Sequence, residues 1–145
     1  MLNEKDVYHL YFIKGRKYSM KIKKASCGFE KEPLKSPFGF KGRYVNDIWQ
    51  TSVFIEDESQ RTGLGLGCQS VLWSDAAVFE KLGQDTGNQA MFSMTGYAVS
   101  LAKDKVFSSP PEMLDYLLPE TLAYGKKITG NADLRTWPGA PANAP

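Results

Sequence analysis

Alternating apolar and polar positions in the first half of the chain predict three β-strands. Residues 20–30 alternate in part and predict a strand with one face in water. Residues 44–56 carry the strongest strand pattern, because β-branched and aromatic side chains dominate both faces. A polar turn at 57–60 and a returning strand at 61–67 complete a hairpin, so we expect an antiparallel meander.

The segment between the first two predicted strands, residues 31–43, is expected to be a loop. Two prolines and two glycines interrupt any regular pattern within it. The same segment nevertheless carries Phe38 and Phe40. Aromatic rings in such a loop favour burial against the core, a partner or a ligand.

From Ser74 onward the spacing of apolar residues becomes helical. Ser74 is the predicted N-cap of a short helix that Gly83 would end. Residues 86–104 predict a longer helix, whose Met91 and Met94 share a face and are interpreted as core filler.

A third helix is predicted to begin at Ser109, with Glu112 completing a capping box. Pro119 lacks a backbone N–H, so we expect a kink or a split there, and Gly125 is the expected end. A three-stranded antiparallel meander followed by about three helices is an α+β fold, because strands and helices do not alternate.

The two ends of the chain differ from this central region. Residues 1–19 are interpreted either as an N-terminal extension or as an extra edge strand formed by residues 7–13, and both alternatives stay open. Residues 136–145 are rich in proline and alanine and are expected to be disordered. The folded domain is therefore expected to cover residues 20–135.

Composition narrows the classes of function. The 145 residues fit one domain, and 18 basic against 16 acidic side chains leave no strong basic surface for nucleic acid. One histidine and two cysteines, without a Cys-x-x-Cys pair, argue against zinc. The apolar run at 7–13 is too short to span a membrane and resembles no signal peptide, so a cytoplasmic protein is expected.

No motif in the chain indicates catalysis. The glycines at 63–67 lack the spacing and the following helix of a phosphate-binding loop, and are interpreted as strand glycines. Asp57 and Glu58 lie at a turn, where solvated charge is the expected role. A small stand-alone enzyme would need a pocket with converging titratable groups, and the spacing of residues predicts none.

The order of the elements is the most informative pattern. A Met-Lys-Ile start at 20–22 is followed by a long loop containing residues 35–38, a strand at 46–56, a glycine-rich strand at 61–67 and then helices. This order and spacing resemble the N-terminal capping domain of the enolase superfamily, in its mandelate racemase and muconate lactonizing enzyme branch. The resemblance covers about residues 20–135.

The resemblance implies that this chain is the substrate-specificity cap of an isomerase or dehydratase, a lyase, that acts on a carboxylate substrate. In that family the cap closes the mouth of a TIM-type barrel, and the base and the magnesium ligands lie on barrel strands. It therefore implies no catalytic residue, no metal and no cofactor in this chain, which alone would be inactive. Mg²⁺ is expected in the barrel of the parent enzyme.

Two cap segments, residues 31–43 and 67–74, are implied to contact the substrate. Aromatic side chains there would exclude water, and a lysine could pair with a carboxylate. The alternative for each residue is packing onto its own domain. The substrate-binding candidates are Lys35, Phe38, Phe40, Lys41, Cys68, Ser70, Leu72 and Trp73.

The expected partners are a barrel domain of the parent enzyme or other copies of this chain. An alternative function is a stand-alone binding or oligomerisation module without catalysis, which would use the 7–13 segment or the aromatic loop. The sequence does not identify the substrate.

Overall fold

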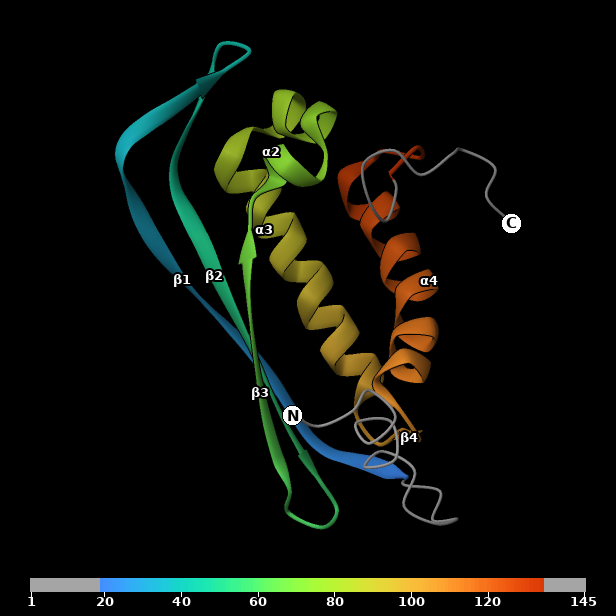
Figure 1. The fold of residues 1–145 in the computed structure, drawn as a ribbon. Coiled ribbons are helices and arrows are strands. Elements are labelled where there is room, and N and C mark those ends of the chain that lie inside the picture. The colour runs from blue at the N-terminus through green and yellow to red at the C-terminus, as the bar shows by residue number, and fades with distance from the viewer. Residues whose placement is uncertain (1–18, 135–145) are drawn as a thin grey trace, which may run out of the picture.

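The computed structural model describes residues 19–134, in which the strands precede the main helices (Figure 1). The predicted tail at 136–145 and the predicted N-terminal piece, apart from Ser19, lie outside the described residues. An antiparallel sheet followed by helices confirms the predicted α+β fold. The described elements are β1 (Met20–Phe40), β2 (Arg43–Asp57), β3 (Thr62–Gln69), α2 (Val71–Ser74), α3 (Ala76–Ala102), β4 (Val106–Phe107) and α4 (Pro110–Thr129).

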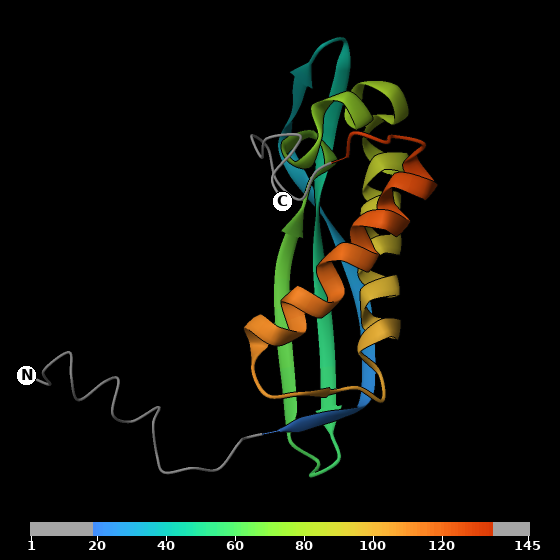
Figure 2. The same cartoon turned by 90° about the vertical axis from the view of Figure 1, so that its right-hand side faces the viewer.

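The sheet has the order β3-β2-β1-β4, and its neighbouring strands are antiparallel. The sequence predicted the first three strands as a meander, but it missed the two-residue β4, which pairs with Met20 and Lys21. The helices lie together on one side of the sheet and leave its other side uncovered by helices (Figure 2).

The prediction of a loop at 31–43 is wrong. β1 continues to Phe40, and the turn to β2 consists of Lys41 and Gly42, both with positive φ. A register shift between Pro33 and Phe38 absorbs the proline-containing part of β1. Prolines are tolerated there because β4 pairs only with the start of β1, so the far half of β1 has one edge without a described neighbour.

The second segment implied to contact the substrate, residues 67–74, is also not a loop in the structure. Gly67 to Gln69 complete β3, and Val71 to Ser74 form the short helix α2. The pairing of β3 with β2 extends to Gln69 opposite Trp49, which explains why the strand outlasts its glycine-rich pattern. The polar turn at 57–60 and the strands on either side of it are confirmed.

The start of α3 lies one residue later than predicted. Asp75 is the N-cap, because its carboxylate accepts hydrogen bonds of 3.0 Å from the N–H groups of Ala77 and Val78. Gly83 breaks the helical path with a φ of 77°, so the predicted interruption at this glycine is confirmed. The longer part of α3 then runs beside β1 and β2.

α4 begins as predicted, with the Ser109 hydroxyl accepting a hydrogen bond from the Glu112 N–H. The Glu112 carboxylate accepts a hydrogen bond from the Ser108 N–H, one residue before the Ser109 N-cap. Pro119 was predicted to kink or split α4. The split is wrong, because α4 continues through Pro119 and packs along α3, whereas the kink stays a prediction. One missing hydrogen bond does not end a helix that tertiary packing supports on both sides of the proline.

Gly125 does not end α4, which runs on to Thr129 and is capped by Gly130. Its role is close packing, since a Cβ at Gly125 would lie 2.6 Å from Met94 Cε and 2.8 Å from Leu134 Cδ2. The glycine therefore allows α4 to approach α3 closely.

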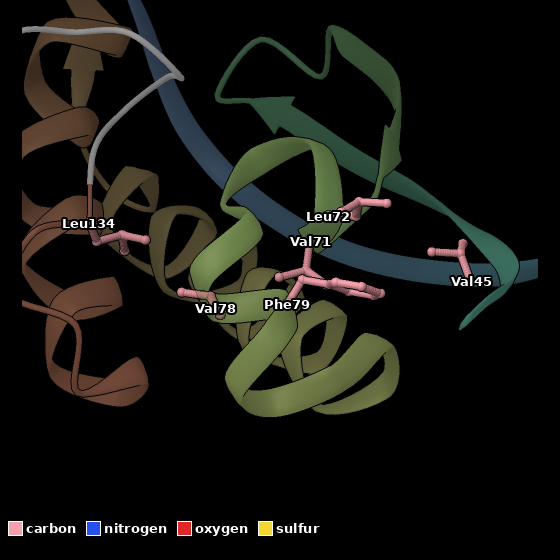
Figure 3. Packing of buried hydrophobic residues seen from close by; sticks show 6 residues of the cluster. All are labelled: Val45, Val71, Leu72, Val78, Phe79 and Leu134. Atoms are coloured by element: carbon pink, nitrogen blue, oxygen red, sulfur yellow. The ribbon is translucent and has the colours of Figure 1, made fainter. Parts of the chain in front are cut away.

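Buried apolar side chains form two clusters. The larger one joins side chains of β2, α2 and the first part of α3 with Leu134, which lies beyond the end of α4, as Figure 3 shows. The smaller one lies at the other end of the sheet and contains Ile22, Ala102 and Phe107. The larger cluster consists of Val45, Val71, Leu72, Val78, Phe79 and Leu134.

None of the helices in residues 19–134 has the length and apolar character needed to cross a membrane.

Candidate functional site

Aromatic side chains gather where the β1–β2 turn approaches α2, and we call this region the aromatic end. Phe38 of β1 lies with its ring centroid 6.1 Å from that of Trp73 in α2. These residues come from the two segments that the sequence predicted as substrate-contacting loops. Trp73 is 70% exposed and Phe38 is 45% exposed, so the pair presents an apolar surface to water. The aromatic end comprises Phe38, Phe40, Tyr44, Trp73 and Phe79.

The position of Trp73 is set by the residues before it in α2. Val71 and Leu72 are buried in the larger core cluster, and the Val71 N–H donates to Asn88 Oδ1 at 2.8 Å. Asn88 is itself buried, so this hydrogen bond is shielded from water. Gly87 leaves room for Val71, because a Cβ there would lie 2.6 Å from Val71 Cγ2. α2 is therefore fixed, and Trp73 stands out from a rigid base.

The β1–β2 turn is fastened to the first part of α3. Arg43 Nε donates to the carbonyl oxygen of Glu80 at 2.7 Å, and Lys41 Nζ lies 3.1 Å from Glu80 Oε2. Phe40 is partly exposed, and its ring centroid lies 6.5 Å from that of the buried Phe79. These contacts hold the turn against the helix and leave Phe38 beside Trp73.

The remaining predicted contact residues are placed in different surroundings. Lys35 is exposed on β1, and Cys68 is exposed on β3. The Ser70 carbonyl accepts hydrogen bonds from the N–H groups of Trp73 and Ser74, so Ser70 starts α2. Leu72 belongs to the core. The structure thus brings Phe38, Phe40, Lys41 and Trp73 together at one end.

A cavity of about 640 Å³ lies between the end of β3 and the helices. Cys68, Ser70 and Trp73 contribute to its wall, together with apolar residues of α3 and residues of α4. Thr121 also lines it, and its hydroxyl oxygen is buried without a hydrogen-bond partner among the described residues. Sequence reasoning missed the share of α4, because no pattern within one helix shows which cavity its face will border.

The distribution of possible metal ligands is also informative. Within residues 19–134 there is no group of three or more His, Cys, Asp or Glu side chains placed to hold a metal ion.

Comparison with known proteins found similar solved structures of low sequence identity. No protein-family model and no curated protein matches the chain. The chain is similar to the L-Ala-D/L-Glu epimerase from Bacillus subtilis, solved with a bound substrate, at 16% identity over 79% of this chain, with a TM-score of 0.47. A dipeptide epimerase from Enterococcus faecalis V583, complexed with Mg and the dipeptide L-Leu-L-Tyr, is similar at 16% identity over 79% of this chain, with a TM-score of 0.42.

The chain spans 29% of the first epimerase and 27% of the second, less than a third of either.

Proposed function

We propose that residues 20–135 are the capping domain of an enolase-superfamily isomerase or lyase that acts on a carboxylate substrate. The observation that carries this proposal is the aromatic end, where Phe38 and Trp73 come from separate segments, meet each other and remain exposed. In this function the aromatic end closes the mouth of a TIM-type barrel. The mandelate racemase and muconate lactonizing enzyme branch is the one that the sequence resembles.

Docking on a barrel would remove the exposed rings from water. Aromatic walls also exclude water from a reaction chamber, which strengthens the electrostatic interactions inside it. A structure that exposes Trp73 on a rigid base is suited to this task, because little ordering of α2 is needed on docking.

Two lysines, Lys35 and Lys41, lie near Phe38 in the sequence and carry positive charge. Lys41 is bound to Glu80 in an exposed ion pair, and such pairs contribute only about 0–1 kcal/mol. Exchange of Glu80 for a substrate carboxylate would therefore cost little. Lys35 is the second candidate for this contact, since it is exposed on the same strand as Phe38.

The chemistry itself is assigned to the barrel. In the resembled family the barrel would supply both the metal ion and the lysine or histidine base that act on the carboxylate substrate. No step through magnesium is assigned to the residues of this chain, which we expect to be inactive alone. Its contribution is to bind, orient and exclude water.

The alternative of a stand-alone binding module predicts that both segments of the aromatic end are packed within the chain or within a dimer. Among the described residues Phe38 and Trp73 are not packed within the chain, and a barrel surface is the cover that the capping function provides for them.

The first test reads the coding DNA downstream of codon 136 in all three frames. A barrel sequence in any frame is expected and would identify the parent enzyme. Its absence from every frame would contradict the proposal.

The second test measures catalysis. The purified chain is assayed for dipeptide epimerisation, racemisation and dehydration of carboxylate substrates, and we expect no turnover. Joined to the barrel, Trp73→Ala should lower kcat/KM at least about tenfold by opening the chamber to water. The control Leu114→Ala removes an exposed leucine of α4 and should leave kcat/KM unchanged. Turnover by the isolated chain, or equal activity of both variants, would overturn the capping function.

A further inference from the structure

The strand β3 forms one edge of the sheet in the part of the chain that the structure describes. It pairs with β2 along its length, from Thr62 to Gln69, and none of the described strands pairs with its other side. Every second backbone N–H and C=O group of β3 therefore points away from the sheet. Such an edge is a template for another extended strand.

β3 lacks three features that often protect a sheet edge, namely charged residues, proline and a bulge. Its sequence from Thr62 to Gln69 contains no charged residue and no proline, and its pairing with β2 shows no bulge. The nearest charged residue, Arg61, is bound to the buried carboxylate of Asp57. The edge is thus eight residues of straight, uncharged strand.

The side of β3 that faces away from the helices is apolar. Leu64 is 67% exposed and Leu66 is 77% exposed, and they point to the same side because they are two residues apart. Leu64 lies opposite Phe54 of β2, which extends the apolar surface toward the middle of the sheet. These leucines contribute to neither the aromatic end nor the cavity wall.

We propose that this chain forms a two-fold homodimer in which β3 pairs antiparallel with β3 of a second copy. An antiparallel pair of identical strands is related by a two-fold axis, so one patch satisfies both sides. A pairing centred on Gly65 places Leu64 opposite Leu66 of the second copy. The eight strands of the two sheets then form one continuous sheet.

The second copy is the occupant that fits the charge and shape of the edge. Two uncharged strands bring no like charges together, and the leucines form two cross-strand pairs. On the helix-facing side of β3, a Cβ at Gly67 would have no neighbouring atom within 4 Å, and the nearest atom to one at Gly65 would be 4.0 Å away. The dimer does not depend on the proposed capping function, because it uses a different surface.

The test measures the molar mass of the full chain by sedimentation equilibrium over a wide concentration range. We expect a concentration-dependent dimer for the natural sequence. Leu66→Glu adds a charge to the edge and should weaken dimerisation at least about tenfold. The matched control Leu114→Glu places the same charge on an exposed leucine of α4 and should leave the dimer intact. Circular dichroism shows whether each variant is folded.

Oxidative crosslinking tests the register. In a Cys68→Ser background, Gly65→Cys should form an intermolecular disulfide, because Gly65 lies opposite itself across the two-fold axis. Gly67→Cys should not, since it lies opposite Gly63 of the second copy. A monomer at all concentrations, a dimer insensitive to Leu66→Glu, or equal crosslinking of both cysteine variants would overturn the proposal.

Discussion

The two hairpin turns at opposite ends of β2 each join neighbouring antiparallel strands, but they are built from different kinds of residues. The β2–β3 turn is polar, and its groups satisfy one another. The β1–β2 turn is short and brings exposed aromatic rings with it. Both reverse the chain, so the difference between them concerns what each end does for the molecule.

At the polar turn the Asp57 carboxylate is buried, and it is the acceptor for the hydrogen bonds that close the turn. It accepts hydrogen bonds from the Arg61 N–H at 2.9 Å and from Arg61 Nε at 2.6 Å. Burial alone would raise the pKa of Asp57, but these hydrogen bonds and the guanidinium charge hold it below its ordinary value. Lys21 of β1 lies 2.7 Å from Glu58, and that contact ties the turn to the neighbouring strand. This end is closed by its own contacts.

At the aromatic end the turn residues Lys41 and Gly42 have positive φ, as a two-residue hairpin turn requires. The polar contacts there fix the turn to α3, but they leave the rings of Phe38 and Trp73 in water. The comparison shows that the two ends of β2 differ in role. Side chains at the polar turn bond to one another and close the fold, whereas Phe38 and Trp73 at the aromatic end stay exposed to a partner.

Phe79→Ala should have the largest effect, because it removes the fully buried ring on which the aromatic end rests. Truncation of a buried phenylalanine costs about 3–5 kcal/mol of the free energy of unfolding. Urea unfolding followed by far-UV circular dichroism measures the loss. A loss below about 1 kcal/mol would show that the end collapses to fill the space and is less rigid than inferred.

Gly87→Ala should displace α2. The new methyl group would meet the β-branched side chain of Val71, which has little freedom to move away, and overpacking of this kind costs about 1–3 kcal/mol. Gly96→Ala in the same helix is the control, since its Cβ would make an ordinary contact at 3.9 Å with Cys27. We expect Gly96→Ala to raise stability by about 0.5–1 kcal/mol. Similar thermal unfolding of the two variants would contradict the fixed position of α2.

The polar turn should make stability depend on acid. Because the pKa of Asp57 is lower in the folded state than in the unfolded chain, its contribution is present above the ordinary carboxyl pKa of 3.8. It is lost as the pH falls from that value through the folded pKa. Asp57→Asn should lower stability at neutral pH and flatten the acid dependence below pH 4, as measured by urea unfolding across pH 2–6. An unchanged slope would assign the acid sensitivity to other carboxyl groups.

Trp73→Ala should have the smallest effect on the isolated chain. The ring is mostly in water already, and substitutions at exposed positions usually change the free energy of unfolding by no more than about 0.5 kcal/mol. The same variant is expected to impair the barrel-joined enzyme, so stability and function separate at this residue. A large loss of stability by calorimetry would instead make Trp73 a structural residue.

Much of the fold follows from local patterns. The strand at 44–56, the polar turn after it and the Ser109 cap are confirmed, because alternation, turn residues and caps act over a few neighbouring residues. The interruption at Gly83 is confirmed for the same reason. Phe38 and Trp73 were both identified as candidate contacts, although their separation of 35 positions in the chain gave no sign that they meet.

The errors arise where distant contacts outweigh local signals. Prolines and glycines at 31–43 predicted a loop, but pairing with β2 keeps this segment extended. Pro119 predicted a kink or a split and Gly125 an end, but packing on α3 continues α4 past both residues without a split. Leu72 was chosen from its position in a presumed loop, whereas the core cluster buries it.

The sequence by itself determined the strands before helices, the polar turn and the aromatic content of the segment at 31–43, because each depends on residue types at short spacing. Only the tertiary structure decided that Phe38 lies beside Trp73, that Lys41 is paired with Glu80 and that β3 has an open edge. These features depend on side chains and strands that are far apart in the chain. Their positions are set by the packing of the whole core rather than by any local preference.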